Sequence, residues 1–110
     1  MANPDAVTFL ARDEQDHASG FAEATLRHDY VNGCTSSPVG FLEGLYVRDE
    51  SRRQGVARAL CQAVEAWALK RGASELASDT WLDSLASERM HEALEFSETE
   101  RVVYFRKSLD

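Results

Sequence analysis

The sequence predicts one α/β (α+β) domain with a mixed, mostly antiparallel sheet, and three observations support this fold class. The 110 residues suffice for one hydrophobic core and are too few for two. Short apolar stretches of strand character are followed by two longer stretches whose apolar residues recur at helical spacing. Turn-forming residues separate these stretches. The expected element order is βββαβαβ, with residues 1–110 as a single domain.

The first three elements are predicted to be strands. Residues 7–12 (VTFLAR) and 19–27 (SGFAEATLR) are apolar and β-compatible, and the polar stretch between them predicts a hairpin. Residues 28–38 (HDYVNGCTSSP) are rich in Asn, Gly, Ser and Pro and predict a loop. The third strand, residues 39–47 (VGFLEGLYV), contains Gly40 and Gly44. They indicate a bulge, or a place where another backbone or a ligand comes close.

A helix, a strand, a helix and a strand complete the predicted order. The first helix is indicated by small or apolar residues at helical spacing, and Gly72 is expected to end it. Those residues are Val56, Leu60, Val64, Trp67 and Ala68. Residues 73–79 predict a short strand, and residues 82–94 predict a second helix capped by Asp83 or Ser84. Residues 99–107 (TERVVYFRK) predict the final strand.

Composition and charge narrow the class of function. Hydrophobic residues make up 44% and charged residues 28%, and no stretch is long enough to cross a membrane. The N-terminus lacks the pattern of a secretion signal, so the expected compartment is the cytoplasm. The net charge of −7 disfavours nucleic acid and membrane as partners. Residues 48–71 nevertheless carry a local charge of +3, which suits either an anion site or a solvated helix.

The two cysteines are not assigned to chemistry. Cys34 lies in the predicted loop and Cys61 on the apolar side of the predicted helix, so both are expected to be free thiols. No His or Cys grouping has the spacing of metal ligands, so no metal is expected.

Residues 52–58 (RRQGVAR) stand where the first helix is expected to begin. The first turn of a helix has unpaired amide groups and the positive end of the helix dipole, so it can bind an anion, and Gly55 permits close approach. The stretch lacks the GK[ST] ending of a Walker A loop and the second and third glycines of a dinucleotide fingerprint. Taken alone, it fits a helix start with solvated arginines better than an anion site.

The order of these motifs resembles the GNAT superfamily of N-acetyltransferases. Arg52, Gly55 and Ala57 match its [Gln/Arg]-x-x-Gly-x-[Gly/Ala] loop, and FLEGLYV, ELASD, MHEAL and ETERVVYFRK are similar to aminoglycoside 6′-N-acetyltransferases. The resemblance implies acetyl-coenzyme A as co-substrate and a cationic small-molecule amine, such as an aminoglycoside, as acceptor. The residues that it places at the coenzyme are Leu45, Val47, Arg52, Arg53, Gln54, Gly55, Val56, Ala57, Arg58, Ser84 and His91.

Acetyl transfer also needs a base and groups that bind the amine. Alkyl amines are mostly protonated at neutral pH, so a carboxylate must remove a proton before attack. The resemblance implies Asp79 as this base and Glu43 as the anchor for the cation, with Tyr30 lining the pocket and His91 near the sulfur of the coenzyme. The plainer alternatives are a solvent-facing Glu43, an Asp79 that caps a turn, a Tyr30 that covers the edge of the core, and a His91 on a helix surface.

The chain departs from the GNAT pattern in its first part. That fold ordinarily starts with a strand and two helices before the hairpin expected at residue 7, and their absence is expected to expose apolar surface and favour self-association. Glu95 stands where the family has Gly, in a position expected to be left-handed. Two alternatives stay open: a non-catalytic remnant that at most binds coenzyme A, and a GNAT enzyme for another small amine.

Overall fold

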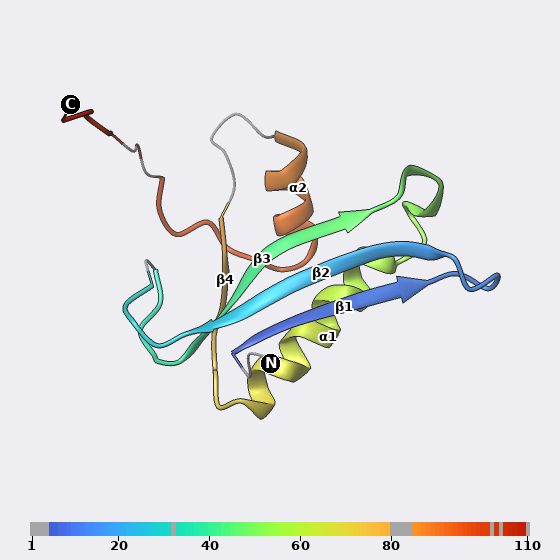
Figure 1. Cartoon of the computed structure of the whole chain (residues 1–110), viewed down its shortest axis with the longest axis horizontal. Coiled ribbons are helices and arrows are strands. Elements are labelled where there is room, and N and C mark those ends of the chain that lie inside the picture. The colour runs from blue at the N-terminus through green and yellow to red at the C-terminus, as the bar shows by residue number, and fades with distance from the viewer. Residues whose placement is uncertain (1–4, 32, 80–84, 102, 104, 110) are drawn as a thin grey trace.

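The architecture is a four-stranded sheet with helices packed on it (Figure 1). The computed structural model describes residues 5–31, 33–79, 85–101, 103 and 105–109. The elements are β1 (Ala6–Arg12), β2 (Ala18–Arg27), β3 (Val39–Val47), a 3₁₀ turn η1 (Asp49–Ser51), α1 (Val56–Lys70), β4 (Leu76–Ser78) and α2 (Leu85–Ala93). The first six strands and helices of the predicted order are therefore confirmed.

The sheet has the strand order β1-β2-β3-β4. β1 and β3 both run antiparallel to β2, whereas β4 runs parallel to β3 and pairs with it only at Gly40–Leu42. The β2–β3 register shifts between Glu23 and Ala24, so Glu43 lies in the irregular part of β3. The bulge that the glycines of this strand predicted is confirmed.

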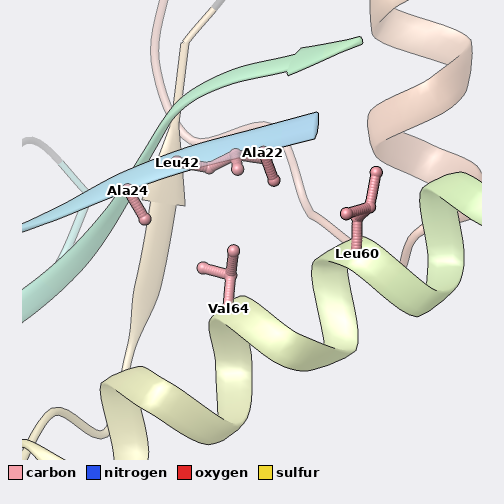
Figure 2. Packing of buried hydrophobic residues seen from close by; sticks show 5 residues of the cluster. All are labelled: Ala22, Ala24, Leu42, Leu60 and Val64. Carbon is pink, nitrogen blue, oxygen red and sulfur yellow. The ribbon is translucent and has the colours of Figure 1, made fainter. Parts of the chain in front are cut away.

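The core lies between one face of the sheet and α1. Alternate residues of β2, among them Ala22 and Ala24, point to this face together with Leu42, and α1 contributes Leu60 and Val64 (Figure 2). All five are at most 4% exposed. Burial of each larger side chain contributes about 1.5–3 kcal/mol. This packing holds α1 under the sheet and so fixes where its first turn lies.

Gly40 lets α1 approach β3. A Cβ at this position would lie 2.9 Å from the Cβ of Ala68 and 3.1 Å from Cδ1 of Leu76. The close approach of another part of the chain, predicted as one reason for this glycine, is confirmed. A side chain here would force α1 away from the sheet.

The ends of both helices follow the predicted signals where the structure describes them. Gly72 has φ of 92° and Ala73 N donates to Ala68 O at 3.0 Å, so α1 ends in a glycine-dependent turn. Glu95 adopts φ of 69° after α2, and the expected left-handed conformation costs about 1 kcal/mol relative to glycine. The predicted caps of the second helix, Asp83 and Ser84, lie outside the described residues.

The predicted final strand is not formed by the described residues of its span, 99–101, 103 and 105–107. The described residues between 97 and 109 form no strand, and Figure 1 shows this tail extending away from the sheet. Val103 is 66% exposed and Phe105 92% exposed. The sequence has high β-propensity, but a strand needs a neighbour whose backbone it can pair with. Within the described part of the chain, this segment pairs with no strand.

The cysteine predictions agree with the structure. Both thiols are free, and Cys61 is 1% exposed in the core. Burial, with the hydrogen bond to Glu65, raises the pKa of Cys61 to about 12, which makes it inert at neutral pH. Among the described helices, none has the length and apolar character needed to cross a membrane.

Candidate functional site

The first part of the site is the loop that joins β3 to α1, which we call the cradle (residues 52–58). Gly55 has φ of 79° and immediately precedes the first residue of α1, Val56. Arg53 also adopts a left-handed conformation, with φ of 64°. A Cβ at Gly55 would meet no atom within 4 Å, so the space beside this backbone is open. The two left-handed residues fold the chain back sharply and leave one side of the helix start accessible.

The start of α1 has the electrostatics of an anion site. No side chain caps it within the described part of the chain, and its first turn contains no acidic residue. The first hydrogen bond of the helix runs from Ala59 N to Gly55 O at 3.0 Å. The amide groups of residues 55–58 precede that bond and carry the positive end of the helix dipole. They can donate to an anion without help from a side chain.

Three polar side chains of the cradle, those of Arg52, Gln54 and Arg58, bind the protein itself. Arg52 donates from Nε to Val47 O at 3.2 Å and forms an ion pair with Asp49 at 3.0 Å. Gln54 donates to Glu50 O at 3.4 Å, and Arg58 donates to Ala93 O, at the end of α2, at 3.0 Å. These contacts stabilise the shape of the loop. The amide groups, rather than these side chains, remain as the donors for a ligand.

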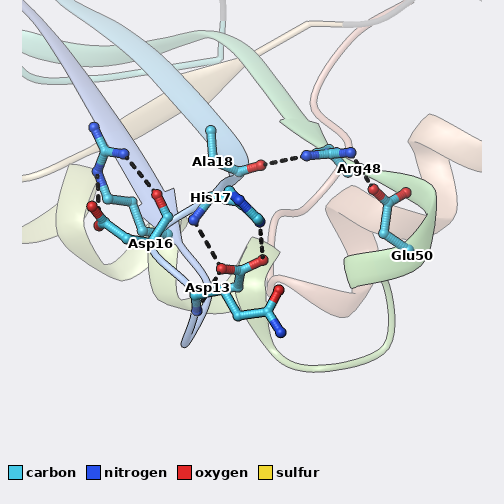
Figure 3. Close-up of polar contacts among 8 residues, drawn as sticks. Asp13, Asp16, His17, Ala18, Arg48 and Glu50 are labelled. Atoms are coloured by element: carbon cyan, nitrogen blue, oxygen red, sulfur yellow. Dashed lines mark hydrogen bonds and ion pairs between the residues drawn. The ribbon is translucent and has the colours of Figure 1, made fainter.

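Arg48 links the segment that precedes the cradle to the β1–β2 hairpin (Figure 3). It donates from its backbone N to Ser19 O at 2.9 Å and from Nη1 to Ala18 O at 3.2 Å, and it forms an ion pair with Glu50 at 2.5 Å. Asp13 shapes the neighbouring turn, accepting hydrogen bonds from the backbone N atoms of Gln15 and His17, each at 2.9 Å. Sequence reasoning missed Arg48, because its partners lie about 30 residues earlier in the chain.

The second part of the site is the opening between β3 and β4. Beyond Leu42, β3 continues to Val47, whereas β4 ends at Ser78, so this edge of β3 has no strand beside it among the described residues. Leu45 and Val47 lie on this part of β3 and pair on the other side with Ala22 and Gly20. An extended ligand with amide groups can pair with such an edge.

His91 lies on α2 and contacts the end of β4, beside the opening. His91 Nδ1 lies 2.7 Å from Ser87 O, and Nε2 lies 2.8 Å from Ser78 Oγ. Its ring also makes an edge contact with Phe96, with centroids 5.2 Å apart. The carbonyl of Ser87 can only accept, so Nδ1 carries a proton. Both ring nitrogens therefore have partners inside the protein, and His91 joins α2 to β4.

Asp79 directly follows this contact and is exposed. Because Ser78 is bound to His91, Asp79 lies where β4, α2 and the opening meet. The chain then enters residues 80–84, which lie outside the described residues, and Ser84 is among them. The structure therefore brings Asp79 and His91 close together in the fold and leaves the predicted role of Ser84 untested.

Glu43 lies on the sheet face opposite α1, bound by two side chains that the sequence did not reveal. Thr25 Oγ1 donates to it at 2.6 Å and Arg27 Nη2 donates to it at 2.9 Å. Burial acts to raise the pKa of Glu43, but these two hydrogen bonds and the charge of Arg27 together hold the pKa below its ordinary value. Glu43 is exposed, as the plain alternative of a solvent-facing side chain expects, but it is also paired with Thr25 and Arg27. The alternation of β2 places residues 25 and 27 on one face, which is the signal that could have found them.

A shallow cavity of about 260 Å³ lies beside Glu43. Glu23 and Thr25 line it together with residues 6–8 of β1. Arg27 lies over the ring of Phe41 at 3.5 Å, at one side of this surface. Two carboxylates and a threonine hydroxyl thus face one hollow, which suits a cationic amine better than an anion.

Tyr30 lies on the loop between β2 and β3 and is 80% exposed. The predicted interpretation of a side chain covering the core edge therefore does not fit it. A larger cavity, of about 410 Å³, lies on the other side of β4, between the second half of α1 and residues 94–99. Its lining includes Cys34, Glu65 and Glu75, none of which belongs to the predicted site. Among the described residues, no cluster of three or more His, Cys, Asp or Glu side chains is able to hold a metal ion.

Comparison with known proteins gives one consistent result. Residues 1–96 match the model of the acetyltransferase (GNAT) family. An aminoglycoside N(6′)-acetyltransferase type 1 of Serratia marcescens is 53% identical over 99% of this chain and 75% of its own length. The protein of the same name from Stenotrophomonas maltophilia is 50% identical over 100% of this chain and 72% of its own length.

Solved structures agree. AAC(6′)-Iy in complex with the bisubstrate analogue CoA-S-monomethyl-acetylneamine has a TM-score of 0.90 and 48% identity, covering 96% of this chain and 71% of that one. The aminoglycoside 6′-N-acetyltransferase AAC(6′)-Ih from Acinetobacter baumannii has a TM-score of 0.91 and 47% identity, covering 96% and 72% of the two chains.

Proposed function

Because this chain belongs to the acetyltransferase (GNAT) family, we propose that it transfers the acetyl group of acetyl-coenzyme A to the 6′-amine of an aminoglycoside. The main structural support is the start of α1, which follows the left-handed Gly55 and has no side-chain cap. The chain is also about half identical to enzymes named for that reaction. The uncapped start of α1 and the acidic hollow beside Glu43 lie in one small domain, which supports a negatively charged donor and a positively charged acceptor.

In this proposal the cradle holds the diphosphate of the coenzyme. The amide groups of residues 53–58 donate to the phosphate oxygens, and Gly55 lets the phosphates approach the backbone. The edge of β3 at Leu45 and Val47 pairs with the amide groups of the pantetheine arm, which directs the thioester toward Asp79. A backbone amide near Leu45 is the proposed donor to the oxyanion.

The amine is bound and deprotonated by carboxylates. Glu43 has used part of its accepting capacity on Thr25 and Arg27, and a carboxylate has about four acceptor positions, so an ammonium group can still bind it. Tyr30 lines the pocket from the loop. Asp79 removes one proton from the ammonium group, which frees the lone pair of the nitrogen for attack.

The chemistry then proceeds by addition and elimination. The neutral nitrogen forms a bond to the thioester carbonyl carbon, and the carbon–sulfur bond breaks as the tetrahedral intermediate collapses. As the intermediate collapses the nitrogen loses its second proton and the departing thiolate takes one up; His91, already protonated on Nδ1, is the proposed group that accepts this proton on Nε2 and donates it, or a hydrogen bond, to the sulfur. Because Nε2 lies against Ser78 Oγ, contact with the sulfur requires that this hydrogen bond be exchanged.

A thiol-release assay tests the proposal. Acetyl-coenzyme A with a neamine-type aminoglycoside is expected to release free thiol, and the same aminoglycoside with a hydroxyl in place of the 6′-amine is the matched control and is expected to release none. Turnover only with polyamines or peptides would show that the acceptor is another class of amine and not an aminoglycoside. Coenzyme binding without any turnover would contradict the proposed reaction and leave a binding protein.

We further propose that two copies associate through the C-terminal tail in the cytoplasm, whose reducing conditions suit the free thiols. Phe105 and Leu109 are 92% and 89% exposed, and the tail sequence has strand character. β4 pairs with β3 on one side only within the described residues, so its other edge can accept a strand from a second copy. Burial of such apolar residues favours association.

Sedimentation of the purified protein tests this association. The unmodified chain is expected to sediment as a dimer, and Phe105→Asp is expected to shift it toward the monomer, because a charge replaces a ring that the dimer would bury. Lys107→Gln, an exposed change in the same tail, is the control and is expected to leave the dimer intact. A monomer at high concentration without any substitution would contradict the proposal.

A further inference from the structure

We infer that Glu75 is a positioning residue that holds the loop of residues 28–38, here called the substrate loop, in place for the acceptor amine. This inference rests on the proposed function, because Tyr30, the proposed pocket residue, lies on that loop. Glu75 directly precedes β4 and is far from the loop in sequence, so its contacts are tertiary.

One carboxylate oxygen of Glu75 accepts hydrogen bonds from the tip of the substrate loop, residues 35 and 36. Oε1 accepts hydrogen bonds from Thr35 N at 2.9 Å, from Ser36 N at 2.9 Å and, at a still shorter separation, from Ser36 Oγ. Ser74 Oγ adds a contact to Ser36 Oγ at 3.2 Å. Two successive amide groups and a hydroxyl thus converge on one oxygen, across 39 and 40 residues of sequence.

These hydrogen bonds are strongest when the Glu75 carboxylate is ionised. The hydrogen bond from Ser36 Oγ, followed by that from Thr35 N, lowers the pKa of Glu75 below its ordinary 4.5. Ionised acceptors make shorter and stronger hydrogen bonds than neutral ones. The anchor therefore has its full strength above pH 4.5 and weakens as the pH falls through the lowered pKa of Glu75.

The other end of the substrate loop is attached to the amine-binding face. The loop starts directly after Arg27, which binds Glu43 and lies over Phe41. Val31 is 8% exposed and packs with Phe41, and Ser37 Oγ donates to His28 O at 2.9 Å. A shift of the loop tip is thereby transmitted to Tyr30 and Arg27. The cradle lies at the opposite end of β3 and has none of these contacts.

Cys34 gives a readout of the anchor that does not depend on turnover. Burial raises the pKa of the Cys34 thiol, and the charge and hydrogen bond of Glu75 raise it further. Removal of the Glu75 charge lowers this pKa and increases the thiolate fraction near pH 8. Because Cys61 is 1% exposed, a soluble alkylating reagent reports on Cys34 in the folded protein.

The test compares Glu75→Gln with Glu65→Gln. Both glutamates line the same cavity, but Glu65 accepts a hydrogen bond from Cys61 rather than from the loop. We expect Glu75→Gln to raise KM for the aminoglycoside about tenfold, as loss of a charge-assisted anchor implies, with KM for acetyl-coenzyme A changed less than about twofold. Glu65→Gln is expected to change neither constant. Equal changes in both constants, or an unchanged KM for the aminoglycoside, would overturn the inference.

Two further measurements keep the inference testable if the unmodified chain shows no turnover. In Glu75→Gln, alkylation of Cys34 by iodoacetamide at pH 8 is expected to be several-fold faster, and the Thr35 and Ser36 amides are expected to exchange faster with deuterium. Unchanged rates would refute the anchor. Absence of turnover with faster alkylation would reject the proposed reaction alone and keep Glu75 as the group that holds the loop.

Discussion

Gly55→Val is expected to weaken coenzyme A binding about a hundredfold. The new side chain projects into the open space beside the cradle, where the Cβ would meet no protein atom within 4 Å and where the proposed phosphate would lie. Loss of two charge-assisted hydrogen bonds of about 1.5 kcal/mol each corresponds to this change. Titration calorimetry with coenzyme A measures it directly.

Backbone strain must be separated from this steric effect. Gly55 has φ of 79°, which a β-branched residue adopts only at a cost, so Gly55→Val also destabilises the fold. Gly72→Val is the matched control, because Gly72 has φ of 92°, lies in equally open space and is at the far end of α1. The two variants are expected to lose similar stability, but only Gly55→Val is expected to lose affinity. If the two variants bound coenzyme A with equal affinity, the proposal that the cradle binds its diphosphate would be contradicted.

Asp79→Asn is expected to reduce turnover by about 100- to 1,000-fold, the usual contribution of a positioned general base. The amide cannot take a proton from the ammonium group, so the reaction depends on the small neutral fraction of the amine. Because that fraction grows with pH, log kcat of the variant is expected to rise by about one for each pH unit below the pKa of the amine. Stopped assays from pH 6 to 9 provide the measurement.

Coenzyme binding separates this effect from misfolding. Asp79→Asn is expected to bind coenzyme A as the unmodified chain does, because Asp79 lies at the end of β4 rather than in the cradle. Asp16→Asn, at an exposed carboxylate in the β1–β2 turn, is the control and is expected to keep full turnover. An unaltered rate in Asp79→Asn would assign the proton transfer to another group.

The three long strands and α1 were predictable because their signals are local. Alternation in residues 19–27 and helical spacing from Val56 onward each specify one buried face, and Gly72 marks the end of the helix. The C-terminal tail, residues 99–107, is the exception. Its β-propensity is as high as that of the true strands, but Phe105 is 92% exposed, because pairing depends on what lies beside a strand rather than on its own residues.

Some features of the site could likewise be predicted from the sequence, and others could not. The cradle was visible in the sequence, because a glycine before an amphipathic stretch determines a helix start by itself. The partners of Glu43 were not, since Arg27 is 16 residues away and reaches it only through the β2–β3 register. The attachment of the loop to Glu75 spans 40 residues, and no local pattern encodes it.

The central claim is that the amide groups at the start of α1 bind the diphosphate of the coenzyme, and a crystal structure with coenzyme A tests it most directly. Diphosphate oxygens within about 3 Å of the backbone N atoms of residues 55–58 are the predicted result. A bound coenzyme whose diphosphate lies elsewhere, with these amides facing solvent, would contradict it.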